Sequence, residues 1–156
     1  MQAACSKLDN AHSGSGHNRT PWAVQVTQEL NGRASPFILP NPYAAGYLMF
    51  YLMIDQVPAR QYAHGSVGRF AIGVATSPDG VTWSRLGDGP IIEGTPGTFD
   101  ERGAGHPSVF LNPHSGLLHM LYQGSPNAGI GMAVMEEQGN LRRWRKVSPS
   151  RPELTA

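Results

Sequence analysis

The chain has 156 residues, of which 40% are hydrophobic and 15% charged, with 19 glycines, 13 prolines and a formal net charge of +1. These values are typical of a folded globular protein rich in turns, and so small a net charge argues against a nucleic-acid partner. The single cysteine, Cys5, excludes an internal disulfide framework and gives no metal cluster, so we expect no cofactor.

The N-terminal residues carry no targeting signal that we recognise. They read MQAACSKLDN, without the basic segment and apolar core of a signal peptide, and no apolar run in the chain approaches the length of a membrane span. We therefore expect a cytoplasmic protein without membrane contact by default. An unsecreted fragment of a secreted parent is the alternative.

The first predicted elements are the end of one repeat unit. Residues 1–10 loosely match a later strand and turn, IGVATSPDG, and Trp22 opens a strand that reads WAVQV. The residues between them, HSGSGHNRT, are polar or small and favour a mobile segment. We assign residues 1–21 to a partial third strand with this segment, and residues 22–34 to a fourth strand and linker.

The next strands occur in two copies. Residues 35–52 read SPFILPNPYAAGYLMFYL, and residues 106–123 read HPSVFLNPHSGLLHMLYQ, which align without a gap. Each copy has an apolar run, an Asn-Pro turn and a second apolar run, the pattern of two strands joined by a tight turn. Pro36 and Pro107 stand at the head of the first strand, where a missing N–H costs least.

A further pair of strands completes each copy. Residues 72–86 read IGVATSPDGVTWSRL and match residues 130–147, IGMAVMEEQGNLRRWRKV, which have a slightly longer turn. No stretch of the chain shows convincing helical spacing of apolar residues. The sequence therefore predicts an all-β protein with four-stranded antiparallel units at residues 35–95 and 96–156.

Three tryptophans mark the period of the repeat. Trp22, Trp83 and Trp144 are evenly spaced along the chain, and four-stranded units in radial repetition describe a β-propeller. We predict a partial β-propeller in one structural domain, half a blade plus two whole blades, with each tryptophan in a fourth strand and packed between blades. Tyr51 and Tyr122 are equivalent in two blades, so we expect both in the core.

Several sequence segments resemble the blades of sugar-processing propellers. IGVATSPDGVTW, HPSVFLNPHSGLLHMLYQG and GTFDERGAGHPSV look like blades of the five-bladed propellers of glycoside hydrolase families 43 and 32 and of the related mannoside phosphorylases. SPDGVTW also resembles the Asp-box of sialidases with one residue removed between Asp79 and Gly80. In sialidases that box braces a hairpin on the face away from the active site.

The resemblance does not carry catalytic carboxylates onto this chain. In family 43 an Asp directly before the first-strand proline and a Glu on another blade flank the scissile bond, roughly 5 to 9 Å apart. The matched positions here are Ser35 and His106, so whether the chain is an enzyme stays open. The candidate catalytic residues are Glu101, Asp100 and His106.

A ligand site is expected on the propeller face where loops enter the first strands. The insertion at residues 54–69 rises on that face, and extra loop length there serves binding or a lid. The predicted substrate-binding residues are Arg33, Ser35, Asp55, Tyr62, His64 and Arg102. The competing interpretations are a solvated, self-paired loop for residues 100–102 and a structural role for His106.

The favoured function is a glycosidase-like propeller fragment that binds carbohydrate or is catalytically degenerate. The alternatives are a non-enzymatic assembly module and an active glycoside hydrolase completed by oligomerisation. Propellers close with about four to eight blades, so two and a half blades leave faces open and predict a homo-oligomer, with a dimer favoured. The basic cluster falls in the outermost strand, where charge guards against edge pairing: Arg142, Arg143, Arg145 and Lys146.

Overall fold

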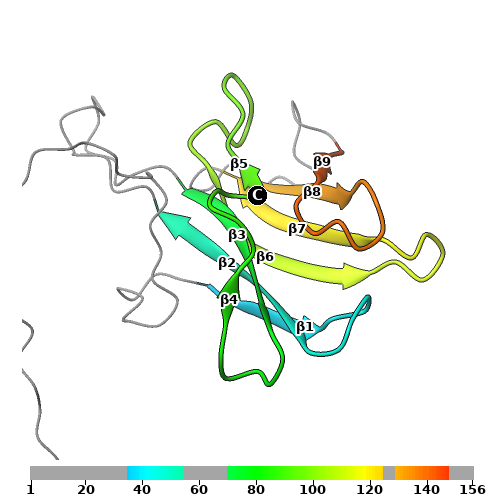
Figure 1. Ribbon diagram of the computed structural model, residues 1–156. Helices are drawn as coiled ribbons and strands as arrows, with labels where there is room; N and C mark the ends of the chain where they lie inside the picture. Colours follow the sequence, from blue (N-terminus) through cyan, green and yellow to red (C-terminus); the bar gives the residue numbers. More distant parts are fainter. Residues whose placement is uncertain (1–34, 55–69, 125–128, 148–156) are drawn as a thin grey trace, which may run out of the picture.

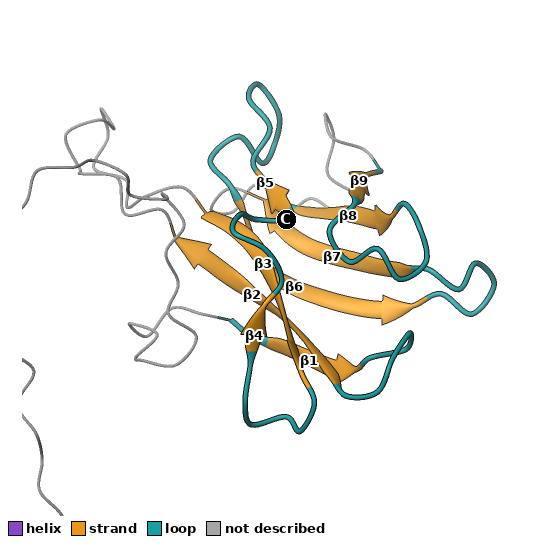
Figure 2. Cartoon of the chain, viewed as in Figure 1, coloured by secondary structure: helices purple, strands orange, loops and turns teal. Residues whose placement is uncertain are grey.

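A computed structural model describes residues 35–54, 70–124 and 129–147 of the protein, which form two antiparallel β-sheets (Figures 1 and 2). No helix occurs within these ranges, so none there is long and apolar enough to cross a membrane. The all-β prediction is confirmed. The strands predicted before Ser35 lie outside the described residues, as does nearly all of the 54–69 insertion.

The first sheet contains the strands of the first predicted unit. Its order is β1-β2-β3-β4, and a fifth short strand also pairs with β3. The strands are β1 (Phe37–Pro40), β2 (Tyr47–Ile54), β3 (Phe70–Ser77), β4 (Ser84–Arg85) and β5 (Ile92–Glu93).

The predicted fourth strand of this sheet is split in two. β4 pairs with the end of β3 and β5 with its start, and β4 begins one residue after Trp83. Between them, Gly87 has a positive φ of 86° and Pro90 has no N–H to donate. The edge strand therefore leaves the ladder and rejoins it.

The second sheet is a regular four-stranded meander. Its strands are β6 (Ala104–Leu111), β7 (Leu118–Gly124), β8 (Ile130–Met135) and β9 (Trp144–Lys146), in the order β6-β7-β8-β9. The register between β6 and β7 shifts between Gly105 and Ser108, which marks a β-bulge at the start of β6.

Side-chain oxygens fix the Asn-Pro turns that the sequence predicted. The Asn41 side chain accepts a hydrogen bond from the Tyr43 amide at 3.0 Å, and Asn112 does the same for His114 at 2.9 Å. An asparagine oxygen that binds the amide two residues on takes the place of a backbone turn bond. The two copies of the repeat therefore turn by the same means.

Asp79 braces the β3–β4 hairpin in a similar way. Its Oδ1 accepts hydrogen bonds from the amides of Thr82 and Val81, each at 2.8 Å. These bonds, that of Thr82 foremost, lower the pKa of Asp79 to about 2. The hairpin is thus held by a carboxylate that stays charged at neutral pH.

The first sheet is buried on both faces, and the second on one. Successive residues of β2 and β3 are buried without alternation, whereas β7 and β8 alternate between buried and half-buried residues. One face of the first sheet packs on the second sheet, where Trp144 meets Phe50 edge-on with 5.7 Å between ring centroids. The predicted packing of a tryptophan between units is confirmed for Trp144.

A tyrosine over a glycine recurs in both sheets. Tyr51 pairs with Gly73 across β2 and β3, and Tyr122 pairs with Gly131 across β7 and β8. A Cβ added at Gly73 would lie 2.8 Å from the Tyr51 ring, and one at Gly131 would lie 2.5 Å from the Tyr122 ring. Both tyrosines are buried, which confirms their core position, and the repeat extends to the glycine on which each ring rests.

Candidate functional site

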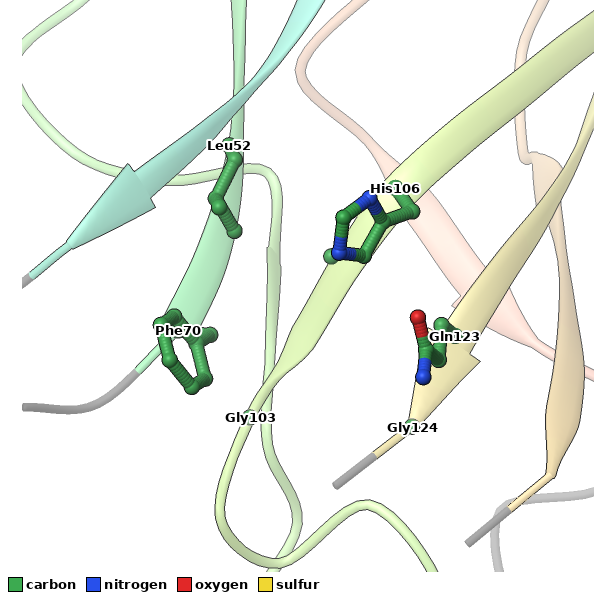
Figure 3. Close-up of a pocket in the computed structure, with 7 residues that line it drawn as sticks. Leu52, Phe70, Gly103, His106, Gln123 and Gly124 are labelled. Atoms are coloured by element: carbon green, nitrogen blue, oxygen red, sulfur yellow. The ribbon is translucent and has the colours of Figure 1, made fainter. Parts of the chain in front are cut away.

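A small hollow lies where the two sheets meet, at the end of β2 and the starts of β3 and β6. Its volume is about 210 Å³. Figure 3 shows Leu52 and Phe70 on one side and His106 and Gln123 on the other. Three glycines complete the lining: Gly103, Gly105 and Gly124.

The glycines are there because side chains would not fit. Gly103 has a φ of 137°, and a Cβ on it would clash with the Phe70 carbonyl oxygen. A Cβ on Gly105 would lie 2.8 Å from the Leu52 side chain. The chain entering β6 therefore passes close against the first sheet, which brings the next residue, His106, to the edge of the hollow.

His106 has an unusual backbone conformation. Its φ is 48°, the only positive value of a non-glycine residue in the part of the chain that the structure describes. It lies within the β-bulge and directly precedes Pro107, which normally favours an extended conformation in the residue before it. A bulge re-aims a side chain, and a strained backbone persists only where its surroundings hold it in place.

Ser35 and His106 meet although they are far apart in the chain. The Ser35 hydroxyl and His106 Nδ1 form a hydrogen bond of 2.9 Å. These are the equivalent residues that precede the first-strand prolines, so the two first strands approach each other at this end. The structure thus brings two of the predicted site residues together, and one of them, His106, lines the hollow.

Asp100 takes part in a different arrangement. It is fully buried, and its Oδ1 accepts bonds from the Thr95 amide at 3.1 Å and from the Thr98 hydroxyl at 2.6 Å. Its Oδ2 accepts from the Tyr122 hydroxyl at 2.9 Å and from Lys146 Nζ at 2.6 Å. Asp100 does not line the hollow, and both of its oxygens are engaged within the protein.

The partners of Asp100 determine its charge state. Burial by itself raises the pKa of the Asp100 carboxyl, but the bonds from Lys146, Thr98 and Tyr122 outweigh burial and lower this pKa below its ordinary value. The pKa of Tyr122 is raised, first by burial and then by its bond to the Asp100 carboxylate and by that charge. Asp100 is therefore held as a carboxylate, and Tyr122 as a neutral donor.

The remaining predicted residues do not join the hollow. Glu101 is exposed and accepts a long bond of 3.4 Å from the Gly97 amide, and Arg102 is exposed next to it. The interpretation of residues 100–102 as a solvated, self-paired loop is therefore wrong for Asp100. This carboxylate is buried and forms an ion pair with Lys146 from β9. The other predicted substrate-binding residues lie outside the described residues: Arg33, Asp55, Tyr62 and His64.

The basic cluster is largely occupied with contacts inside the protein. Arg142 donates to the Leu86 carbonyl in the first sheet at 2.5 Å, and Arg143 pairs with Glu136 at 3.3 Å. Lys146 donates to the Glu93 carbonyl as well as to Asp100. Within the described ranges, no group of three or more His, Cys, Asp or Glu side chains could hold a metal ion.

Gln123 was missed from the sequence, yet a signal for it was present. Its equivalent in the first copy is Leu52, and both residues line the hollow. A polar residue that replaces an apolar one at an equivalent repeat position indicates a role outside the core. The same comparison of repeat positions shows that Ser35 of the first copy is replaced by His106 in the second.

No protein-family model matches the chain. It is similar to two curated proteins, both uncharacterised. Rv1502 of Mycobacterium tuberculosis strain H37Rv is 34% identical over 88 residues, which are 55% of this chain and 29% of that protein. MT1551 of strain CDC 1551 is 39% identical over 70 residues, which are 44% of this chain and 23% of that protein. The matched part therefore spans less than a third of the length of these curated relatives.

Proposed function

We propose that this chain is part of a β-propeller that binds carbohydrate, without hydrolysing it, at the hollow beside His106. The observation that carries the proposal is the left-handed His106 at the β6 bulge, held by Ser35 at the edge of a hollow. A residue that costs backbone strain without filling the core indicates a functional constraint.

The lining of the hollow suits a sugar. A sugar ring presents hydroxyl groups along its edge and C–H groups on its faces, and binding sites combine apolar walls with a few placed polar groups. Phe70 and Leu52 form an apolar wall, while His106 and Gln123 offer hydrogen-bonding groups opposite it. The volume of about 210 Å³ lies below the ~300–1,000 Å³ of sites for larger ligands, which suits one small polar unit.

The carboxylates argue against hydrolysis. Glycoside hydrolysis ordinarily needs two carboxyl groups on either side of the scissile bond. Among the described residues none lines the hollow, since both oxygens of Asp100 are bonded internally and Glu101 is exposed elsewhere. The resemblance to glycosidase propellers supports a sugar ligand, and the lining of the hollow supports binding rather than cleavage.

The test is a glycan-array screen followed by calorimetry on each hit. We expect His106→Ala and Gln123→Ala to weaken binding at least tenfold, and His114→Ala, an exposed histidine in the β6–β7 turn, to leave it unchanged. A panel of aryl glycosides measures turnover in parallel. Turnover that disappears in Glu101→Gln would replace this proposal with the active glycosidase, and no binding to any glycan would reject a sugar ligand.

Self-association is the second candidate function, and the outer face of the second sheet favours it. Phe110 is 44% exposed on this face, opposite His119, and the half-buried residues Leu121 and Met132 lie on the same outward side of β7 and β8. The equivalent face of the first sheet is the one covered by the second sheet, and no further sheet among the described residues covers this face in the same way.

The first relative is longer than this chain. The matched segment is only 29% of the first relative, so that protein is long enough for more units of this kind than the chain contains. Light scattering on this chain is expected to give the mass of a homo-oligomer, with a dimer favoured, and Phe110→Ser is expected to shift it towards the monomer. A monomer at all concentrations would reject self-association.

A further inference from the structure

The lining of the hollow beside His106 selects the kind of chemical group that fits there. Of the residues that line it in the described part of the chain, none is an Asp, Glu, Lys or Arg. Leu52 and Phe70 form an apolar wall, and His106 and Gln123 supply the polar side chains opposite it. Because a charge without a partner is costly to enclose, the matching group is uncharged, with an apolar end and hydrogen-bonding atoms beside it.

Ser35 governs the hydrogen-bonding role of His106. A neutral imidazole carries a proton on only one of its two ring nitrogens, and the bond made by one nitrogen sets the role of the other. Ser35 Oγ lies 2.9 Å from His106 Nδ1. The hydroxyl is a donor as well as an acceptor, so it donates to Nδ1 when the proton lies on Nε2, the form that a neutral histidine side chain ordinarily prefers.

The His106 ring carries Nε2 towards the hollow. Figure 3 shows the ring directed from β6 towards the wall formed by Leu52 and Phe70. Nε2 is the ring nitrogen farther from the backbone, and Ser35 bonds the nearer one. A β-bulge re-aims the side chain that it carries, and His106 lies within the bulge with a positive φ. With its proton on Nε2, His106 is a donor at the edge of the hollow.

Gln123 adds an amide from a fixed position. It lies in β7, where its backbone pairs with Gly105 of β6 on one side and with Ile130 of β8 on the other. Its side chain has an oxygen that accepts hydrogen bonds and an NH2 group that donates them. The hollow therefore combines an N–H donor, an amide that bonds in both directions and an apolar wall.

An acetamido group matches these three features, because it has a carbonyl oxygen that accepts, an N–H that donates and an apolar methyl group. We propose that the hollow recognises the acetamido group of an N-acetylated sugar. Its carbonyl accepts from His106 Nε2, its N–H donates to the Gln123 oxygen, and its methyl packs on Leu52 and Phe70. Ser35 is the positioning residue, since it keeps the proton on Nε2. The inference rests on the proposed sugar site and names the substituent that this site selects.

Calorimetry with matched methyl glycosides tests the ligand. N-acetylglucosamine and N-acetylgalactosamine are compared with glucose and galactose, which carry a hydroxyl in place of the acetamido group. We expect at least one acetamido sugar to bind about tenfold more tightly than its hydroxyl counterpart. Gln123→Leu, which introduces the residue type of the equivalent position in the first copy, should bring this ratio close to one.

The outcomes separate this inference from the proposed function. Equal binding within each pair of sugars would overturn the acetamido preference and leave sugar binding in place, whereas no binding of any glycan would reject both. An N-acetyl-lysine amide carries the same group on an open chain and serves as the probe for a protein ligand. Tighter binding of this probe than of every acetamido sugar would overturn the sugar as the source of the group.

Nuclear magnetic resonance of the ring nitrogens tests the role of Ser35. At about pH 8, where histidine side chains are ordinarily neutral, we expect His106 to carry its proton on Nε2. Ser35→Ala should raise the share of the form protonated on Nδ1 and weaken binding of the acetamido sugar roughly three- to tenfold. Ser108→Ala is the matched control, because Ser108 is an exposed serine of the same strand, and it should alter neither. A proton on Nδ1 in the wild type, or unchanged binding in Ser35→Ala, would overturn the proposal.

Discussion

Lys146 and Asp100 come from distant parts of the chain and form an ion pair with 2.6 Å between Nζ and Oδ2, and the carboxylate is fully buried. The pair joins the last strand of the second sheet to the loop that leads into its first strand. Lys146 Nζ also donates to Thr95 Oγ1 at 2.7 Å, so the cation ties that loop down at two points. Loop and edge strand are thereby held as one unit.

Removal of the carboxylate should destabilise the fold at neutral pH. Asp100→Asn leaves Lys146 partly buried without its counter-charge, and breaking one side of a buried pair costs about 3–5 kcal/mol. Urea unfolding monitored by circular dichroism measures this loss. Glu101→Gln is the matched control, because the neighbouring carboxylate is exposed, and its change should stay within about 0.5 kcal/mol. Equal effects of the two variants would contradict the structural role of Asp100.

The same pair predicts a pH dependence. The pKa of Asp100 is lower in the folded protein than its ordinary value of 3.8, so the folded state holds the carboxylate more strongly than the unfolded chain. Its contribution is therefore present above pH ~4 and is lost as the pH falls through the folded pKa. We expect the stability of Asp100→Asn to fall less steeply below about pH 5 than that of the wild type. Equal slopes of the unfolding free energy against pH for the two proteins below about pH 5 would show that Asp100 does not contribute.

His106 should be replaceable by glycine without loss of stability. The left-handed conformation costs a non-glycine residue about 1–2 kcal/mol, and the exposed bond to Ser35 contributes about 1 kcal/mol. His106→Gly removes both the strain and the bond, so the two effects on the free energy of unfolding nearly cancel. We expect its Tm to match the wild type within about 3 °C, while glycan binding is lost. His106→Ala keeps the backbone strain and should melt below the glycine variant. The opposite order would show that strain at residue 106 is small.

Gly131 should not tolerate even a methyl group. A Cβ at this position would lie 2.5 Å from the rings of both Phe99 and Tyr122, and overpacking in a filled core costs about 1–3 kcal/mol. Thermal unfolding of Gly131→Ala measures the loss. Gly89→Ala is the control, because no atom lies within 4 Å of its added Cβ and its φ is not positive. A Gly131→Ala variant as stable as the control would mean that the tyrosine ring moves aside freely.

Much of the fold could be predicted because its causes are local or repeated. Apolar runs bounded by Asn-Pro and Ser-Pro-Asp-Gly turns indicated the strands, and the equivalence of Tyr51 and Tyr122 placed both in the core. The split of the fourth strand was missed, although Gly87 and Pro90 show its cause. Only part of the site could be foreseen: His106 and its partner Ser35 were named from their place before the first-strand prolines, whereas the lining residues Gln123 and Phe70 were not.

The sequence by itself determined the repeat, the strand type, the turns and the residues at equivalent positions, because these depend on neighbours within a few residues and on a recurring period. Only the tertiary structure decided which polar residues meet. Asp100 and Glu101 are adjacent and chemically alike, yet one is buried against Lys146 from β9 and the other faces solvent. That difference depends on how an edge strand packs over a loop far from it in the chain, and side-chain chemistry along the chain does not specify such a contact.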